Sequence, residues 1–84
     1  MQTKLQRVMR IPEVLPIRGR SRASHYADIK AGLFTSPVHL GAKAVGWPES
    51  EVAAINAARI AGKSEGEIKA LVAQLHALRH AQAA

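Results

Sequence analysis

Hydrophobic residues follow a helical pattern in the C-terminal part of the chain. Apolar positions three and four residues apart continue for about two heptads, and Ser64 and Glu67 before them have the spacing of a capping box. This pattern predicts a long amphipathic helix within residues 63–84. Its apolar positions are Ile68, Leu71, Leu75 and Leu78.

The preceding segment, residues 48–62, has the same periodicity. A proline and two acidic residues open it, which suits the first turn of a helix, and Val52 and Ile55 lie at helical spacing. Gly62 is a suitable stop for this helix. We therefore expect a second helix here.

Two shorter helices are predicted near the N-terminus. Residues 11–19, IPEVLPIRG, carry a proline suited to a first turn and end at a glycine, although Pro16 requires a short or distorted helix. Residues 21–31 follow at once, with Ser21 as a candidate N-cap and Gly32 as a candidate stop. Two helices joined by so short a turn predict a helix-turn-helix.

The middle of the chain has a β pattern instead. PVHL and AVGW are short β-prone runs separated by GAK, which predicts a hairpin, or wing, within residues 37–47. We expect a mainly α fold with a small β-hairpin. It consists of a basic N-terminal arm (residues 1–10), a winged helix-turn-helix domain (11–62) and a C-terminal amphipathic helix (63–84).

The excess of positive charge is confined to one half of the chain. Residues 1–47 carry eight Lys and Arg against two acids, and residues 48–84 carry four of each, so the whole net charge of +6 lies in the first half. Clustered basic charge is typical of a protein that binds a polyanion such as DNA. A basic protein kept soluble by its charge is the alternative.

The second predicted helix has an apolar side and a polar side when its residues are placed about 100 degrees apart. We expect the apolar side to pack against the core and the polar side to face a partner. The apolar side holds Ala23, Tyr26, Ala27 and Ile29, and the polar side holds Ser21, Ser24, His25 and Asp28, with Arg22 at its flank.

The polar side suits the major groove of DNA, because early residues of such a helix reach base edges. Arg22 is able to donate two hydrogen bonds to guanine, and Asp28 to accept from cytosine or to orient Arg22 or His25. An ordinary solvated helix face is the alternative. With the wing included, the predicted DNA-binding set is Arg20, Ser21, Arg22, Ser24, His25, Asp28, Lys30, His39 and Lys43.

The three aromatic residues are Tyr26, Phe34 and Trp47, and no two of them share a predicted element. Stacking of unpaired bases needs an exposed aromatic platform, whereas this distribution is typical of core anchors. We assign all three to the core.

The C-terminal helix has two possible uses. Its apolar positions match a coiled-coil seam that would form a homodimer, and folding back onto its own domain is the alternative. His76 and His80 have the spacing of metal ligands but no third ligand, so we assign them to a polar flank and expect no metal and no cofactor. The predicted dimerisation residues are Ile68, Leu71, Leu75 and Leu78.

Enzyme signatures are missing from the sequence. It has no glycine-rich phosphate loop and no nucleophile elbow. We expect neither catalysis nor a small-molecule ligand. No apolar run approaches the roughly 20 residues needed to cross a bilayer, and there is no cysteine for a disulfide. We expect a cytoplasmic protein without a membrane partner.

Four motifs then occur in a characteristic order: SRASHY, AGLF, PVHLG and AVGWPESEV. Their order and spacing resemble the AlpA family of phage and prophage regulators over about residues 10–63. The resemblance implies a small winged helix-turn-helix like those of excisionases and MerR-type regulators. It places Ser21, Arg22 and Ser24 in the recognition helix, Tyr26 and Trp47 in the core, and Lys43 in the wing.

The chain departs from the family pattern at His25, where an apolar residue is usual, and at Ala27, where an arginine is usual. The resemblance nevertheless implies a transcription regulator of a prophage or integrated element, acting on double-stranded DNA as a dimer or as cooperative monomers and associated with the nucleoid when bound. Two alternatives stay open. They are an excisionase-like factor that binds and bends DNA, and a protein-interaction module that acts through the C-terminal helix.

Overall fold

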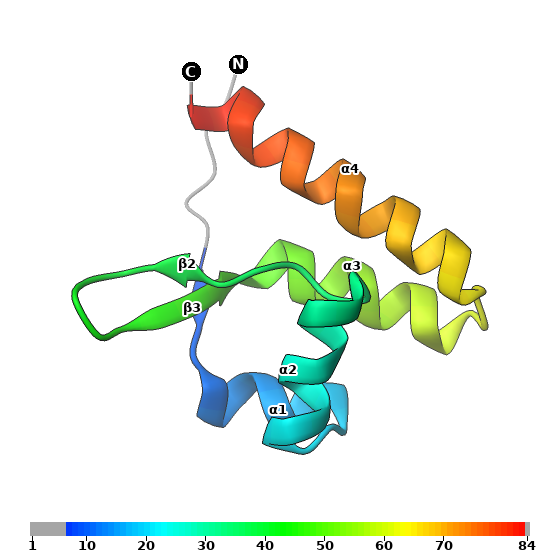
Figure 1. The fold of residues 1–84 in the computed structure, drawn as a ribbon, viewed down its shortest axis with the longest axis horizontal. Helices are drawn as coiled ribbons and strands as arrows, with labels where there is room; N and C mark the ends of the chain where they lie inside the picture. The colour runs from blue at the N-terminus through cyan, green and yellow to red at the C-terminus, as the bar shows by residue number, and fades with distance from the viewer. Residues whose placement is uncertain (1–6, 84) are drawn as a thin grey trace.

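The computed structural model describes residues 7–83, and these residues form four helices and three short strands. The arrangement confirms a mainly helical fold with a small β-hairpin, consistent with a winged helix-turn-helix (Figure 1). In chain order the elements are β1 (Val8–Met9), α1 (Ile11–Arg18), α2 (Arg22–Ala31), β2 (Val38–His39), β3 (Val45–Pro48), α3 (Glu49–Ile60) and α4 (Glu65–Ala83).

α1 and α2 form the predicted helix-turn-helix. α1 is only eight residues long and contains Pro16, in agreement with the limit expected of that proline. It ends at Gly19, whose φ of 67° lets the chain reverse within a residue. Ser21 then caps α2, because its Oγ accepts a hydrogen bond from the backbone N–H of Ser24 at 3.1 Å.

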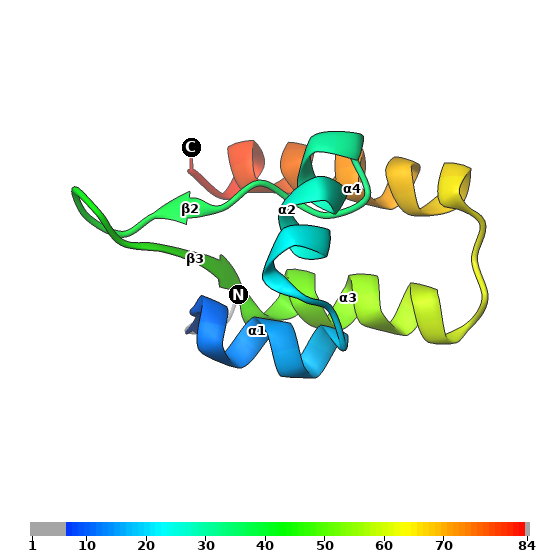
Figure 2. The same ribbon diagram turned by 60° about the horizontal axis from the view of Figure 1, so that its bottom comes forward.

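The wing is the hairpin β2–β3, which extends away from the helices (Figures 1 and 2). Val38 pairs with Gly46, and His39 pairs with Val45, in antiparallel register. β1 lies along the other edge of β3, so the strand order is β1-β3-β2. This third strand lies in the segment assigned to a basic arm, and its two residues are too few to produce a periodic signal.

Gly46 in β3 lies against both residues of β1. A Cβ at this position would lie 2.5 Å from Val8 Cγ1 and 2.9 Å from the carbonyl oxygen of Met9. Carbon atoms do not approach that closely without displacement, so the three-stranded sheet requires glycine here.

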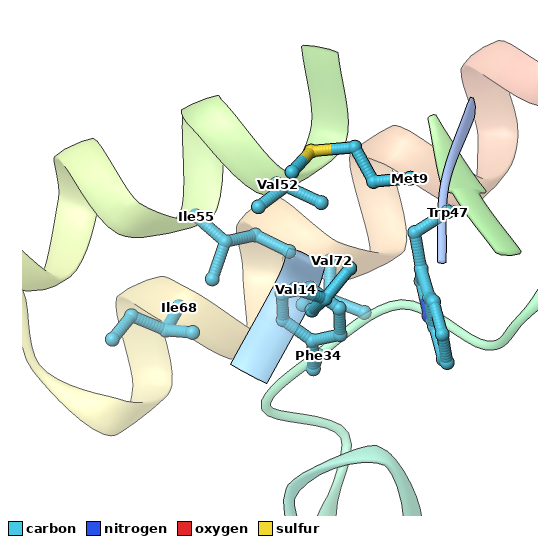
Figure 3. Close-up of a cluster of buried hydrophobic side chains, with 8 residues drawn as sticks. All are labelled: Met9, Val14, Phe34, Trp47, Val52, Ile55, Ile68 and Val72. Atoms are coloured by element: carbon cyan, nitrogen blue, oxygen red, sulfur yellow. The ribbon is translucent and has the colours of Figure 1, made fainter. Parts of the chain in front are cut away.

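The core lies where α1, α3, α4 and β3 meet the loop that follows α2 (Figure 3). Phe34 and Trp47 belong to it, as predicted, and Trp47 Nε1 donates to the carbonyl oxygen of Thr35 at 2.9 Å. The prediction for Tyr26 is wrong, because this side chain is 36% exposed on α2. The buried apolar residues are Met9, Val14, Phe34, Trp47, Val52, Ile55, Ile68 and Val72.

α4 folds back onto its own domain. Its N-terminus has the predicted capping box, in which the Ser64 N–H donates to Glu67 Oε1 at 3.0 Å and the Glu67 N–H donates to Ser64 Oγ at 3.2 Å. The connection from α3 is short, so α4 returns along α3. Ile68 is buried, Leu71 and Leu75 pack against the core, and Leu78 is 48% exposed.

Three of the four predicted dimerisation residues therefore pack inside the monomer. A domain this small has a small core, and α4 covers part of it. Within residues 7–83, no helix combines the length and the hydropathy that a membrane crossing requires.

Candidate nucleic-acid interface

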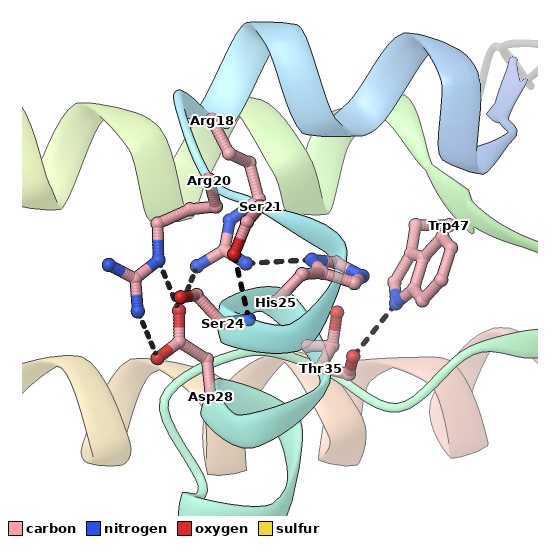
Figure 4. A network of polar contacts seen from close by, with 8 residues as sticks. All are labelled: Arg18, Arg20, Ser21, Ser24, His25, Asp28, Thr35 and Trp47. Carbon is pink, nitrogen blue, oxygen red and sulfur yellow. Dashed lines mark hydrogen bonds and ion pairs between the residues drawn. The ribbon is translucent and has the colours of Figure 1, made fainter.

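The inward face of α2 is polar (Figure 4). Arg18, at the end of α1, donates from Nη2 to Asp28 Oδ2 at 2.9 Å, and its Nη1 lies 2.7 Å from His25 Nδ1. Arg20, in the turn, donates to both oxygens of the same carboxylate, from Nε to Oδ2 at 3.0 Å and from Nη2 to Oδ1 at 2.8 Å. Two guanidinium groups thus share one buried carboxylate, and this polar network joins α1 to α2.

The carboxylate and the guanidinium groups of the network each favour the charged form of the other. Burial alone would raise the pKa of the Asp28 carboxyl, but the hydrogen bonds from Arg20 and Arg18 outweigh burial and hold that pKa below its usual range. Burial lowers the pKa of Arg18, and Asp28 opposes that effect. The Arg18 guanidinium also lies 3.9 Å from the ring centroid of Phe34, a cation–π contact that offers it further stabilisation.

His25 is the third member of the network and is fully buried. A guanidinium only donates hydrogen bonds, so His25 Nδ1 must be an unprotonated acceptor. Burial first, and then the positive charge of Arg18, lower the pKa of His25 to about 4; Arg20 acts in the same direction and Asp28 in the opposite one. His25 is therefore neutral near pH 7, and its ring packs edge-on against Trp47 with centroids 4.7 Å apart.

These contacts correct the predicted orientation of α2. His25 and Asp28 were expected to reach DNA, and both are buried against the rest of the domain. Ala23, Tyr26 and Ala27, which were expected to pack inward, are exposed instead. Ile29 packs against the core as predicted, and Ser21 is exposed as predicted, so the exchange of sides is only partial. The physical reason is that Arg18 and Arg20, just before the helix, supply partners that allow the polar side to be buried.

The outward face of α2 consists of Arg22, Ala23, Tyr26, Ala27 and Lys30, all exposed. Arg22, Tyr26 and Lys30 follow one another at intervals of four residues, so they lie in one row along the helix. The guanidinium carbon of Arg22 lies 5.7 Å from the ring centroid of Tyr26. The two alanines beside this row leave the helix backbone open to close approach.

The other predicted contacts are divided between the turn and the wing. Ser21 is exposed but its Oγ serves as the helix cap, Ser24 is half-buried, and Arg20 is held by Asp28. His39 and Lys43 are exposed on the wing, Lys43 within the turn that joins its strands. The structure therefore places the exposed predicted cations in two groups, Arg22 and Lys30 on α2 and Lys43 on the wing.

A surface depression lies beside the turn between α1 and α2. Arg20, Arg59 and Lys63 line it together with Asp28 and Glu65. Both oxygens of Asp28 are already bound by arginines, so its charge is compensated within the domain. The depression adds cations of α3 and of the loop after it to the basic surface, and none of these was predicted as a contact.

Metal-ligand chemistry is not assembled in the part of the chain that the structure describes. Within residues 7–83, no three His, Cys, Asp or Glu side chains are grouped to hold a metal ion. His76, one of the two histidines at metal-ligand spacing, instead accepts a hydrogen bond from the backbone N–H of Ser36 at 3.1 Å.

Comparison with known proteins gives a consistent result. The family model described as prophage CP4-57 regulatory protein (AlpA) matches residues 7–60. Uncharacterized protein ORF88 of Enterobacteria phage P4 is 46% identical over 61 residues, which cover 73% of this chain and 69% of that protein. No solved structure matches significantly. The family match runs from just before β1 to the end of α3, and α4 lies beyond it.

Proposed function

This chain belongs to the AlpA family of prophage regulatory proteins, and from that premise we propose that it is a sequence-specific DNA-binding transcriptional regulator of a prophage or integrated mobile element. α2 reads base edges in the major groove, and the wing contacts the DNA backbone. The observation that carries the proposal is the outward face of α2, where Arg22, Tyr26 and Lys30 are exposed in one row.

The chemistry of this row suits base recognition near the start of the helix. Arg22 is the first residue of α2, which is the part of a recognition helix that enters the groove most deeply. Its guanidinium matches the two acceptors of guanine, and it lies within cation–π distance of the Tyr26 ring. Ala23 and Ala27 permit close approach and offer methyl groups to thymine.

The remaining exposed cations suit the phosphate backbone. Lys30 lies in the last turn of α2, and Lys43 lies in the turn of the wing. A lysine is a compact charge without the fork geometry of arginine, so it binds phosphates without selecting a base. Contacts of this kind release counterions and make binding weaken as salt is raised.

The packing of α4 favours monomers that bind side by side on repeated sites. Ile68, Leu71 and Leu75 are used in the core of the domain itself, so an independent coiled coil would have to remove them from it. The proposed regulator therefore needs no dimer to present α2 to DNA.

Selection of bound DNA from a random library by the purified protein, at two salt concentrations, tests the proposal. A recovered motif with salt-sensitive binding supports it, and the spacing of repeats reports the arrangement of subunits. Salt-sensitive binding without a motif would instead indicate an architectural, excisionase-like protein. Absence of binding at both salt concentrations would refute the proposal and favour a protein partner.

A further inference from the structure

α4 lies beyond the region shared with the family model, yet its second half is bonded to the base of the wing. Ser36 is two residues before β2. Its backbone N–H donates to His76 Nε2 at 3.1 Å, its Oγ lies 3.3 Å from the same nitrogen, and its carbonyl oxygen accepts from Arg79 Nη2 at 2.8 Å. The backbone N–H and carbonyl of Ser36 are thus both bonded to α4, and its hydroxyl lies beside the same histidine.

Arg79 is itself fixed by α3. Its Nε donates to Glu51 Oε2 at 2.7 Å and its Nη2 to Glu51 Oε1 at 2.6 Å, in a two-pronged ion pair. Glu51 is 5% exposed and the Arg79 side chain 23%, so solvent screens this ion pair only partly. Glu51, Arg79, His76 and Ser36 therefore form a continuous bridge from α3 through α4 to the wing.

The second strand of the wing, β3, is held by β1 and by Trp47 in the core, whereas its first strand, β2, has few other constraints. The two strands share two residue pairs, and one further hydrogen bond joins the Leu40 N–H to the Ala44 carbonyl at 2.8 Å. On the β2 side, the chain is anchored at Thr35 by Trp47 and at Ser36 by α4. A hairpin this short takes its direction from the residues that hold its base.

We propose that His76 and Arg79 are positioning residues that orient the wing for its contact with DNA. This inference rests on the proposed function, in which Lys43 binds a backbone phosphate. The first half of α4 is held separately by Ile68 and Val72 in the core, so the domain should stay folded when the bridge is lost. Arg79→Ala does leave the buried Glu51 carboxylate without its ion pair, so this variant should be less stable than the wild type. α4 then acts as an internal brace and not as a contact with DNA.

Measurement of DNA affinity for Arg79→Ala, His76→Ala and Lys43→Ala, alone and combined, tests the brace. One phosphate contact adds about 0.9 to the salt slope of DNA binding. Its loss should therefore lower the affinity roughly eightfold more in 0.1 M salt than in 1 M salt. We expect Arg79→Ala to lose most of what Lys43→Ala loses, and the double variant to lose little more. Arg79→Ala combined with Arg22→Ala should instead give multiplied losses. If the fold losses in affinity multiply in the Arg79→Ala, Lys43→Ala double variant as they do in the Arg79→Ala, Arg22→Ala double variant, the brace is overturned.

Glu51→Ala separates bracing from direct contact. This variant raises the net charge by one, so a model in which Arg79 touches DNA predicts unchanged or tighter binding. The brace predicts weaker binding, because Arg79 loses the partner that fixes it. His76→Gln, whose amide oxygen is able to accept from the Ser36 N–H, should retain more affinity than His76→Ala. Gln74→Ala, exposed on α4, is the matched control and should bind like the wild type.

Hydrogen exchange of the free protein gives a readout that needs no DNA. Arg79→Ala and His76→Ala should speed exchange at the Ser36 and Leu40 amides while leaving the α2 amides protected. Unchanged exchange at both amides would overturn the brace even if DNA binding is confirmed. Faster exchange in a protein that binds no DNA would retain the brace and refute the proposed function.

Discussion

The two faces of α2 both carry polar side chains, but only one of them is available to a partner. On the inner face, Asp28 and His25 are buried because Arg18 and Arg20 bind both oxygens of the Asp28 carboxylate and Arg18 also binds His25 Nδ1. On the outer face, Arg22 and Lys30 form no ion pair within the described residues 7–83. The comparison teaches that side-chain polarity does not locate a binding face; the availability of internal partners does.

The largest expected difference between the faces is in stability. Asp28→Ala removes the carboxylate that compensates Arg18 and Arg20, and leaves a buried guanidinium without its ion pair. Removing one partner of a buried pair costs about 3–5 kcal/mol of folding free energy. Urea unfolding at pH 7 measures it, with Lys30→Ala on the outer face as the control, expected within about 0.5 kcal/mol of the wild type. Equal stability of the two variants would show that the inner network is dispensable.

The inner face should also make stability depend on pH through His25. Its pKa is about 4 in the folded protein and near 6.5 in the unfolded chain, so the unfolded state binds the proton first as the pH falls. The contribution of His25 to the free energy of unfolding is about 3 kcal/mol. It is fully present above about pH 6.5 and is lost as the pH falls from about 6.5 to 4.

Urea unfolding across this range, for the wild type and for His25→Asn, isolates the effect. Asparagine keeps an acceptor for Arg18 and does not titrate, so the variant should be less stable at pH 7 and should vary less with pH. Contributions of the other histidines are common to both proteins and cancel in the difference. Parallel curves would show that His25 does not titrate with folding.

Most elements of the fold could be predicted because each has a local signal. Ser21, Gly32 and the Ser64–Glu67 capping box mark helix ends through contacts within a few residues, and these contacts are present. β1 could not be predicted, since its two residues form a strand only by pairing with β3. Local chemistry therefore located the helices, and tertiary pairing added the strand.

The site was harder to predict than the fold because it depends on which groups meet. The interpretation of His25 and Asp28 as outward residues assumed that polar side chains on this helix are exposed to solvent. A signal was present in the sequence: Asp28 is a lone acid after a run of arginines, with Arg18 and Arg20 directly before the helix. The exposure of Tyr26 follows from the same error, since the two faces are complementary.

The outer face should show its function in affinity and not in stability. Arg22→Ala is expected to cost roughly 1–3 kcal/mol on the selected site, to relax base preference at one position, and to cost less on random DNA. Binding titrations on both DNAs measure it, and unfolding of the same variant should match the wild type. An equal loss on both DNAs would show that Arg22 only holds a phosphate.

The smallest expected effect comes from the wing, and it sharpens the contrast with α2. Lys43→Ala should weaken binding to the selected site and to random DNA by the same factor, and should lower the salt slope by about one unit. Titrations at several salt concentrations measure the slope, and Lys43→Arg, which keeps the charge, should preserve it. Because a phosphate carries no base identity, the ratio of the two affinities should stay constant in Lys43→Ala while it falls in Arg22→Ala. An unchanged slope would remove the wing from the interface and leave the outer face of α2 as the whole of the proposed contact.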